Sequence, residues 1–136
     1  MSQDNVEIVR RAMGAASRRP KPDFATTNDL YHPDHEFISR QGALEGGVHR
    51  GARGYREWRL SVEETVPFEA RLESVTEIDE DRVLAITRTS SRGKSSGVPL
   101  PEERMASIVT VRGGKVIRTE NYRSPEEALE IAGLVE

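Results

Sequence analysis

Residues 109–134 read VTVRGGKVIRTENYRSPEEALEIAGL, and their order of turns and apolar residues indicates one kind of architecture. Two runs rich in β-branched residues flank Gly113-Gly114, a pair that suits a two-residue hairpin turn because such turns need positive φ. Ser124 can then cap a helix, and Gly133 can end it in the left-handed conformation. The segment therefore predicts a hairpin followed by a short terminal helix that closes over one face or end of a sheet.

Length and composition limit the class of protein. The chain has 136 residues, which suits one domain, and we expect a single domain over residues 1–136. It has no cysteine, so disulfides and thiolate metal sites are impossible. Lys and Arg total 20 against 23 Asp and Glu, and this balance argues against nucleic-acid binding. The chain shows no signal-peptide pattern and no apolar run of roughly 18 residues. We predict a cytoplasmic protein with no membrane and no nucleic-acid partner.

Three helices are predicted ahead of the main strands. Residues 4–18 carry apolar side chains at helical spacing, and residues 23–31 form a shorter segment that Asp23 can cap. The third candidate covers residues 54–66, where aromatic and apolar side chains recur along one face. Pro67 ends it because proline cannot continue a helix. The N-terminal half is therefore predicted to be helical, apart from one early strand.

Strands are predicted where apolar and polar residues alternate with a period of two. An early short strand covers residues 35–40, after a helix break at residues 32–34. The glycines of residues 42–54 indicate a turn or hairpin. Later segments predict an antiparallel meander with strands at residues 70–78, 82–90, 103–112 and 115–123. This order of elements predicts an α+β domain with its helices on one face of a curved sheet.

Short strings along the chain add to this prediction. They are NVEIVRR at residues 5–11, LYHPD at 30–34, RGARGYREW at 50–58, DRV at 81–83, GKVIR at 114–118 and EEALEIAGL at 126–134. In this order they resemble the NTF2-like superfamily and, within it, the SnoaL-like proteins, over essentially the whole chain. The resemblance implies a cone: a curved, mostly antiparallel sheet wrapped around three N-terminal helices, with a short C-terminal helix and a pocket open at one end. It also implies a homodimer that pairs through the outer face of the sheet.

The same resemblance implies positions for catalytic groups, and this sequence departs from them. Ketosteroid-isomerase-like members use a carboxylate base on the strand after the second helix, which falls near Ser39 here. SnoaL-like cyclases use an acid late in the final strand and a histidine on its neighbour, which fall near Asn121 and Ser107. All three residues are neutral, and Asn121 can hydrogen-bond a carbonyl or a water but cannot abstract a proton at neutral pH. A register shift of one residue would place Glu120 in the pocket instead.

Other pocket candidates carry an ordinary structural reading beside the functional one. Arg88 lies in the middle of a predicted strand, where it either faces an anionic or carbonyl-bearing ligand or belongs to the exposed outer face. No aspartate two residues away completes an epoxide-hydrolase-like pair with it. Tyr55 and Trp58 share one face of the third helix and either line the pocket or belong to the core. His49 precedes a loop near the expected pocket mouth, where it is a candidate acid or base.

No cofactor or metal is predicted. His32 and His35 lie three residues apart, but their segment is predicted as a helix end and a turn rather than a metal site. The chain has no phosphate-binding loop, dinucleotide fingerprint or Gly-x-Ser-x-Gly elbow.

Two hypotheses about function remain open. The first is a cofactor-free isomerase, cyclase, dehydratase or hydrolase that acts on a small hydrophobic or oxygenated molecule. The second is a non-catalytic ligand-binding or dimeric partner-binding module. Carboxylates distinguish them: Glu36, Glu73 or Glu120 buried in the pocket would favour an enzyme, whereas apolar side chains with Asn121 and Ser107 would favour binding.

Overall fold

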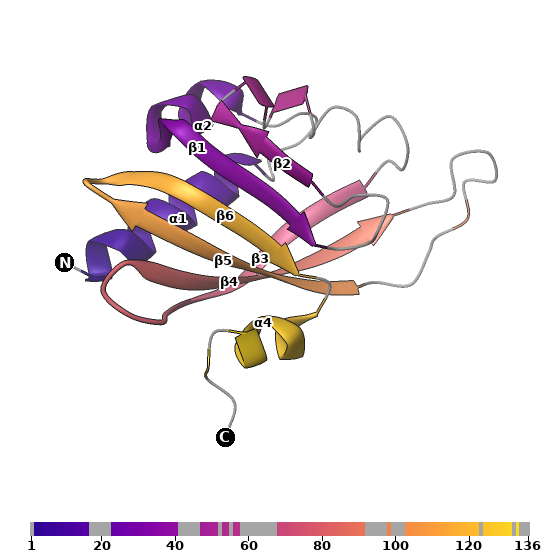
Figure 1. Cartoon of the computed structure of the whole chain (residues 1–136). Coiled ribbons are helices and arrows are strands. Elements are labelled where there is room, and N and C mark those ends of the chain that lie inside the picture. The colour runs from indigo at the N-terminus through magenta and orange to yellow at the C-terminus, as the bar shows by residue number, and fades with distance from the viewer. Residues whose placement is uncertain are drawn as a thin grey trace.

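A six-stranded sheet with helices on both faces forms the part of the chain that the computed structural model describes (Figure 1). The described residues are 2–16, 23–40, 47–51, 53–54, 56–57, 68–91, 98, 103–122, 124–131 and 133. The helices are α1 (Ser2–Ala16), α2 (Phe24–Leu30) and α4 (Pro125–Ile131). The strands are β1 (Tyr31–Arg40), β2 (Gly47–Arg50), β3 (Phe68–Glu77), β4 (Arg82–Ser91), β5 (Glu103–Arg112) and β6 (Lys115–Tyr122).

The strand order is β2-β1-β6-β5-β4-β3. Strand β1 pairs with β6 in parallel, and the other described pairs are antiparallel. Strands β3 to β6 follow one another in both sequence and space, so the predicted meander is confirmed. At its last turn Gly113 and Gly114 have φ of 58° and 77°, the conformation for which the two glycines were expected.

The helices differ from the prediction mainly at their ends. Helix α1 begins at Ser2 rather than residue 4, and residues 17–18 lie outside the described residues. Asp23 caps α2 as predicted, because its Oδ1 accepts a hydrogen bond from the Thr26 N–H at 3.2 Å. Of the third predicted helix, residues 54–66, only residues 54, 56 and 57 are described, and those three are helical.

Strand β1 corrects the prediction of a short strand after a break. It begins at Tyr31, directly after α2, so residues 32–34 lie within it. Its pairing with β6 is irregular between Tyr31 and Glu36. Such an irregularity accommodates Pro33, which has no N–H to give to a regular ladder. The helix ends at Leu30, one residue before its predicted end, and the chain turns straight into a strand.

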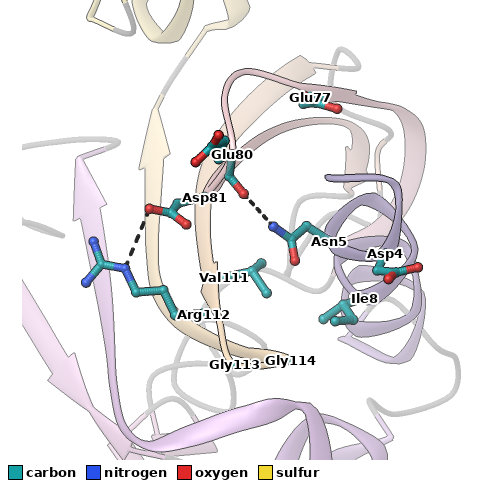
Figure 2. A pocket seen from close by; sticks show the side chains of 10 residues that line it. All are labelled: Asp4, Asn5, Ile8, Glu77, Glu80, Asp81, Val111, Arg112, Gly113 and Gly114. Carbon is teal, nitrogen blue, oxygen red and sulfur yellow. Dashed lines mark hydrogen bonds and ion pairs between the residues drawn. The ribbon is translucent and has the colours of Figure 1, made fainter. Parts of the chain in front are cut away.

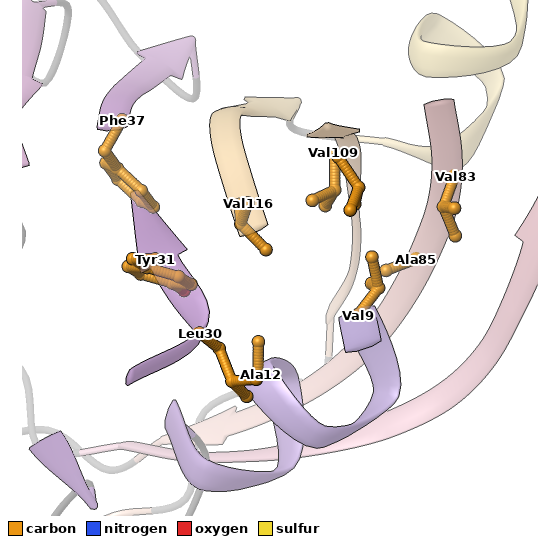
Figure 3. Close-up of a cluster of buried hydrophobic side chains, with 10 residues drawn as sticks. Val9, Ala12, Leu30, Tyr31, Phe37, Val83, Ala85, Val109 and Val116 are labelled. Atoms are coloured by element: carbon orange, nitrogen blue, oxygen red, sulfur yellow. The ribbon is translucent and has the colours of Figure 1, made fainter. Parts of the chain in front are cut away.

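One hydrophobic cluster fills the space between α1 and the sheet (Figure 3). Val9 of α1 is fully buried and belongs to this cluster together with Val83, Ala85 and Val109. Full burial of a valine stabilises a fold by roughly 1.5–3 kcal/mol, so this contact helps to hold α1 against the sheet. We call the side of the sheet that carries these residues the inner face.

A second cluster lies on the opposite side, which we call the outer face. Leu84 alternates with Val83 and Ala85 along β4 and clusters with Ile108 and with Ala128 of α4. Helix α4 therefore covers the outer face, whereas helices on a single face were expected. Ser124 begins α4 as predicted, because its Oγ accepts a hydrogen bond from the Glu127 N–H at 3.2 Å.

Candidate ligand-binding face

Four neighbouring strands place polar side chains together on the inner face. They are His35 of β1, Thr119 and Asn121 of β6, Ser107 of β5 and Thr87 of β4, and each is at most 8% exposed. We call these five residues the polar row. Buried polar side chains in such number need hydrogen-bond partners, so the row is either a structural network or a binding surface.

Sheet register explains why the row exists. Ser107 lies directly opposite Asn121 on one side and Ala85 on the other. Residues directly opposite in neighbouring strands point to the same face, so Asn121 shares the inner face with Ala85. Ser39 is the backbone partner of Asn121 on β1, and its side chain lies outside what the structure describes. The ladder therefore brings together the three positions that the resemblance singled out.

Ser107 and Asn121 form the shorter of the two side-chain contacts that the structure describes within the row. Ser107 Oγ donates to Asn121 Oδ1 at 2.5 Å, and the two residues are 5% and 7% exposed. A distance of 2.5 Å lies in the range of O–H···O bonds and is short for N–H···O, which supports the oxygen as the atom that faces Ser107. The amide nitrogen of Asn121 consequently points away from Ser107.

His35 and Thr119 form a second pair. His35 is fully buried, its Nε2 lies 3.1 Å from Thr119 Oγ1, and its ring stacks on Tyr31 at a centroid distance of 4.3 Å. Burial lowers the pKa of His35 to about 4, because a low-dielectric surrounding disfavours the charged imidazolium. His35 is therefore neutral at pH 7, and a group with so low a pKa is a weak general base there.

Two of the three diagnostic carboxylates face away from the row. Glu36 alternates with Phe37 along β1 and pairs with Arg50 at 2.8 Å on the outer face. Glu120 alternates with Asn121 along β6 and accepts a hydrogen bond from the Tyr122 hydroxyl at 3.0 Å. The alternative register that would put Glu120 beside the ligand is therefore not the one present.

Arg88 and the third carboxylate also lie on the outer face. Arg88 alternates with Thr87 and donates from Nη2 to Glu73 Oε1 at 2.9 Å, while Arg104 Nη2 reaches Glu73 Oε2 at 2.7 Å. Hydrogen bonds from Arg88 and Arg104 lower the pKa of Glu73 below its usual range. The outward orientation of Arg88, which the sequence left open beside the inward one, is the one present.

The remaining candidates from the sequence lie at or beyond the edge of the row. His49 of β2 is half-buried and directly opposite Phe37, with 6.4 Å between their ring centroids. Tyr55 and Trp58 lie outside the described residues. Sequence reasoning missed Thr87 and Thr119, although Thr119 precedes Asn121 by two residues, the spacing of one strand face.

A hollow of about 650 Å³ lies at the other end of β6, around the tight turn that precedes it (Figure 2). Asn5 of α1 closes one side by donating to the Glu80 carbonyl oxygen at 2.8 Å, and Arg112 pairs with Asp81 at 3.7 Å. The hollow begins at Gly114, seven residues from Asn121, a separation of roughly 23 Å along a strand. It is therefore distinct from the polar row. Among the described residues, no group of three or more His, Asp and Glu could hold a metal ion.

Several solved structures are similar to this one. TerC, co-crystallised with polyporic acid, matches at 20% identity and a TM-score of 0.76, covering 96% of this chain and 98% of TerC. A protein with a ketosteroid isomerase-like fold from Catenulispora acidiphila DSM 44928, in complex with trimethylamine, matches at 17% and 0.70, covering 95% and 94%. An NTF2-like protein of unknown function from Burkholderia pseudomallei K96243 matches at 15% and 0.75, covering 95% and 97%.

These likenesses define the fold. The chain has the NTF2-like fold, in the form that a protein from Jannaschia sp. CCS1 described as a SnoaL-like polyketide cyclase also shows. An LEH-like epoxide hydrolase from M. tuberculosis matches too, so proteins with different activities share this architecture. No family model and no curated protein matches the chain. None of the described helices is long and apolar enough to cross a membrane.

Proposed function

We propose that this protein binds a small hydrophobic or oxygenated molecule against the polar row of the inner face. The observation that carries the proposal is the chemistry of the row: five buried polar side chains, none of which carries a charge at neutral pH. An uncharged ligand with an apolar body and one or two oxygens matches such a surface, because a buried charge would have no counter-charge among these residues.

Two further observations support binding at this place. Thr87 Oγ1 is buried and has no hydrogen-bond partner within the described part of the chain, so a ligand group or a water is expected there. Apolar side chains flank the row, including Phe37, Ala85 and Val109. TerC and the Catenulispora protein were both solved with small molecules, so the fold accommodates such ligands in other proteins.

We favour binding over acid–base catalysis. An isomerase, cyclase, dehydratase or hydrolase needs a group with a pKa near the working pH and in reach of the substrate. Glu36, Glu73 and Glu120 all face outward, and the pKa of His35 is about 4. The described inner face therefore supports recognition better than proton transfer.

Native mass spectrometry of the freshly purified protein tests this function. We expect a bound small molecule in the wild type and in Glu120→Gln, and its loss in Asn121→Leu, because residue 121 lies on the inner face and residue 120 on the outer face. Asn121→Ser guards against a folding defect in the leucine variant, which far-ultraviolet circular dichroism would reveal. Retention of the ligand by both Asn121 variants, with loss in Glu120→Gln, would place the binding site elsewhere. Conversion of the ligand by the wild type would instead support the enzyme hypothesis.

The homodimer implied by the resemblance remains a proposal. Helix α4 buries Ala128 against the outer face, so a second copy would have to use a part of that face beside α4, and we place it on the β1–β2 side. Val48 of β2 is 49% exposed there, which supports this placement. Sedimentation at micromolar concentration tests it: a single species near the chain mass of 15.2 kDa would contradict the dimer.

A further inference from the structure

The hydrogen bond between Ser107 and Asn121 sets which end of the Asn121 amide faces the ligand site. We propose that Ser107 is the specificity-determining residue of the ligand site. By donating to Asn121 Oδ1, it holds the amide so that Nδ2 presents its N–H groups to the ligand. The site then selects molecules that carry an acceptor oxygen, such as a ketone, ester or quinone carbonyl. This inference rests on the proposed function and adds the chemical class of the ligand.

The geometry of the Asn121 amide links the position of its oxygen to that of its nitrogen. Oxygen and nitrogen lie on the two arms of one planar group, so an interaction that holds Oδ1 also sets the position of Nδ2. Ser107 Oγ holds Oδ1 at 2.5 Å, and Ser107 lies directly opposite Asn121 in the ladder. Both residues are buried, so bulk water does not compete for either atom.

The neighbours of Asn121 leave its amide nitrogen available to a ligand. Thr119, two residues earlier on the same face, is engaged with His35 at 3.1 Å. Within the described part of the chain, no hydrogen bond reaches Asn121 Nδ2. This nitrogen is not one of the fully buried side-chain atoms that lack a partner, so it is accessible to an acceptor on a ligand or a water. Serine is required only because its hydroxyl donates; it has no charge to contribute.

An amide that presents its N–H groups distinguishes a ligand with an acceptor oxygen from an analogue that has no acceptor at the same position. A site built to hydrogen-bond a substrate rejects an analogue that lacks the bonding group, because the site's own polar atom is then left unpaired. Replacing C=O by C=CH₂ keeps the shape nearly constant and removes the acceptor. The ratio of the two affinities therefore reports the net gain from the hydrogen bond after the cost of taking the carbonyl out of water.

Three pairs of probes measure this ratio at different sizes: acetophenone, 2-acetylnaphthalene and 4-acetylbiphenyl, each with its isopropenyl counterpart. Affinities come from proton–nitrogen correlation spectra, in which the side-chain amide of Asn121 reports binding directly. For the pair that fits best, we expect the wild type to prefer the ketone by about tenfold. In Ser107→Ala the amide is free to turn, and the preference should fall to about twofold or less, with the alkene affinity little changed.

Matched variants separate specificity from stability. Ser107→Thr keeps a hydroxyl donor at the same place and should restore the tenfold preference, which a purely structural role for Ser107 would not predict. Glu120→Gln on the outer face should leave it unchanged. Equal affinities for ketone and alkene in the wild type, both bound at the inner face, would overturn this inference and leave the proposed function standing. Absence of binding by every probe, with no bound ligand in the purified protein, would overturn both.

Discussion

His35 Nε2 and Thr119 Oγ1 lie 3.1 Å apart, in a hydrogen bond that joins β1 to β6 inside the protein. These two strands form the parallel pair of the sheet, and the meander of β3 to β6 reaches β1 only through it. The contact therefore adds a side-chain link to the backbone pairing of β1 with β6. It also makes the fold sensitive to the protonation of a single buried histidine.

The stability of the protein should fall between pH 6.5 and pH 4 because of His35. The ordinary pKa of 6.5 applies in the unfolded chain, and burial lowers the folded value to about 4. The unfolded state therefore takes up the proton first, so the contribution is complete above pH 6.5 and is lost as the pH falls through 4. The expected loss is about 3 kcal/mol in the free energy of unfolding.

Urea unfolding of the wild type and of His35→Gln at several pH values measures this loss. Carboxylates also titrate near pH 4, and the comparison removes their shared contribution. The wild type should lose more stability than the variant over this interval. Parallel pH profiles for the two proteins would show that His35 does not titrate as described.

Gly114 and Gly14 should respond to alanine in opposite directions. A Cβ at either position meets no atom within 4 Å, so the two sites differ in backbone conformation and not in space. Gly114 has φ of 77° in the β5–β6 turn, and Gly114→Ala should cost about 1–2 kcal/mol. Gly14→Ala lies in helix α1 and should stabilise the protein by about 0.5–1 kcal/mol. Thermal unfolding checks both. An unchanged Gly114→Ala would contradict the positive φ of the turn, and a destabilised Gly14→Ala would contradict the expected gain in the helix.

Glu73 should contribute more to the stability of the protein than an ordinary surface carboxylate. It lies between Arg88 and Arg104, and Glu73→Gln leaves these two arginines, which are directly opposite in the ladder, without their shared counter-charge. The melting temperature should fall at low salt and recover in part at high salt, because ions screen exposed charges.

Glu57→Gln is the matched control for this prediction. Its partner Arg53 lies four residues away on one helical turn, and both side chains are largely exposed. Such a pair contributes little. Since hydrogen bonds lower the pKa of Glu73, its contribution is present above the usual pKa of 4.5 and is lost as the pH falls through the lowered value. Equal melting temperatures of the two variants at low salt would contradict a stabilising role of Glu73 between Arg88 and Arg104.

Local sequence signals predicted the elements well where one residue type has one physical role. Gly113 and Gly114 marked the last turn, and Asp23 and Ser124 capped their helices as expected. The start of β1 was not predicted, because Pro33 indicates a break in any regular element. Only the sheet pairing shows that a strand with an irregular ladder accommodates it.

The faces of the sheet were harder to predict than the strands. A period of two shows which residues share a face, but it does not show which face is inner. Along β4, Val83 and Ala85 are as apolar as Leu84 and Ile86, because α1 covers one face and α4 the other. The direction of Arg88 therefore depended on packing that no local pattern contains.

The candidate site also depends on tertiary structure that no local pattern contains. Asn121 and Ser107 were candidates because of their positions in a resemblance, whereas their hydrogen bond follows from the pairing of β5 with β6. Thr87 and His35 join the row only because β4 and β1 lie beside these two strands. A single sequence records none of those neighbours.

Intermolecular nuclear Overhauser contacts between a bound probe and the methyl groups of the sheet test the central claim most directly. With 2-acetylnaphthalene as the probe, we predict contacts to the methyl groups of Ala85 and Val109, which lie on the inner face beside Ser107 and Asn121. Leu84 and Ile108 alternate with them on the outer face. Contacts to Leu84 and Ile108 without any to Ala85 and Val109 would contradict a ligand site on the polar row.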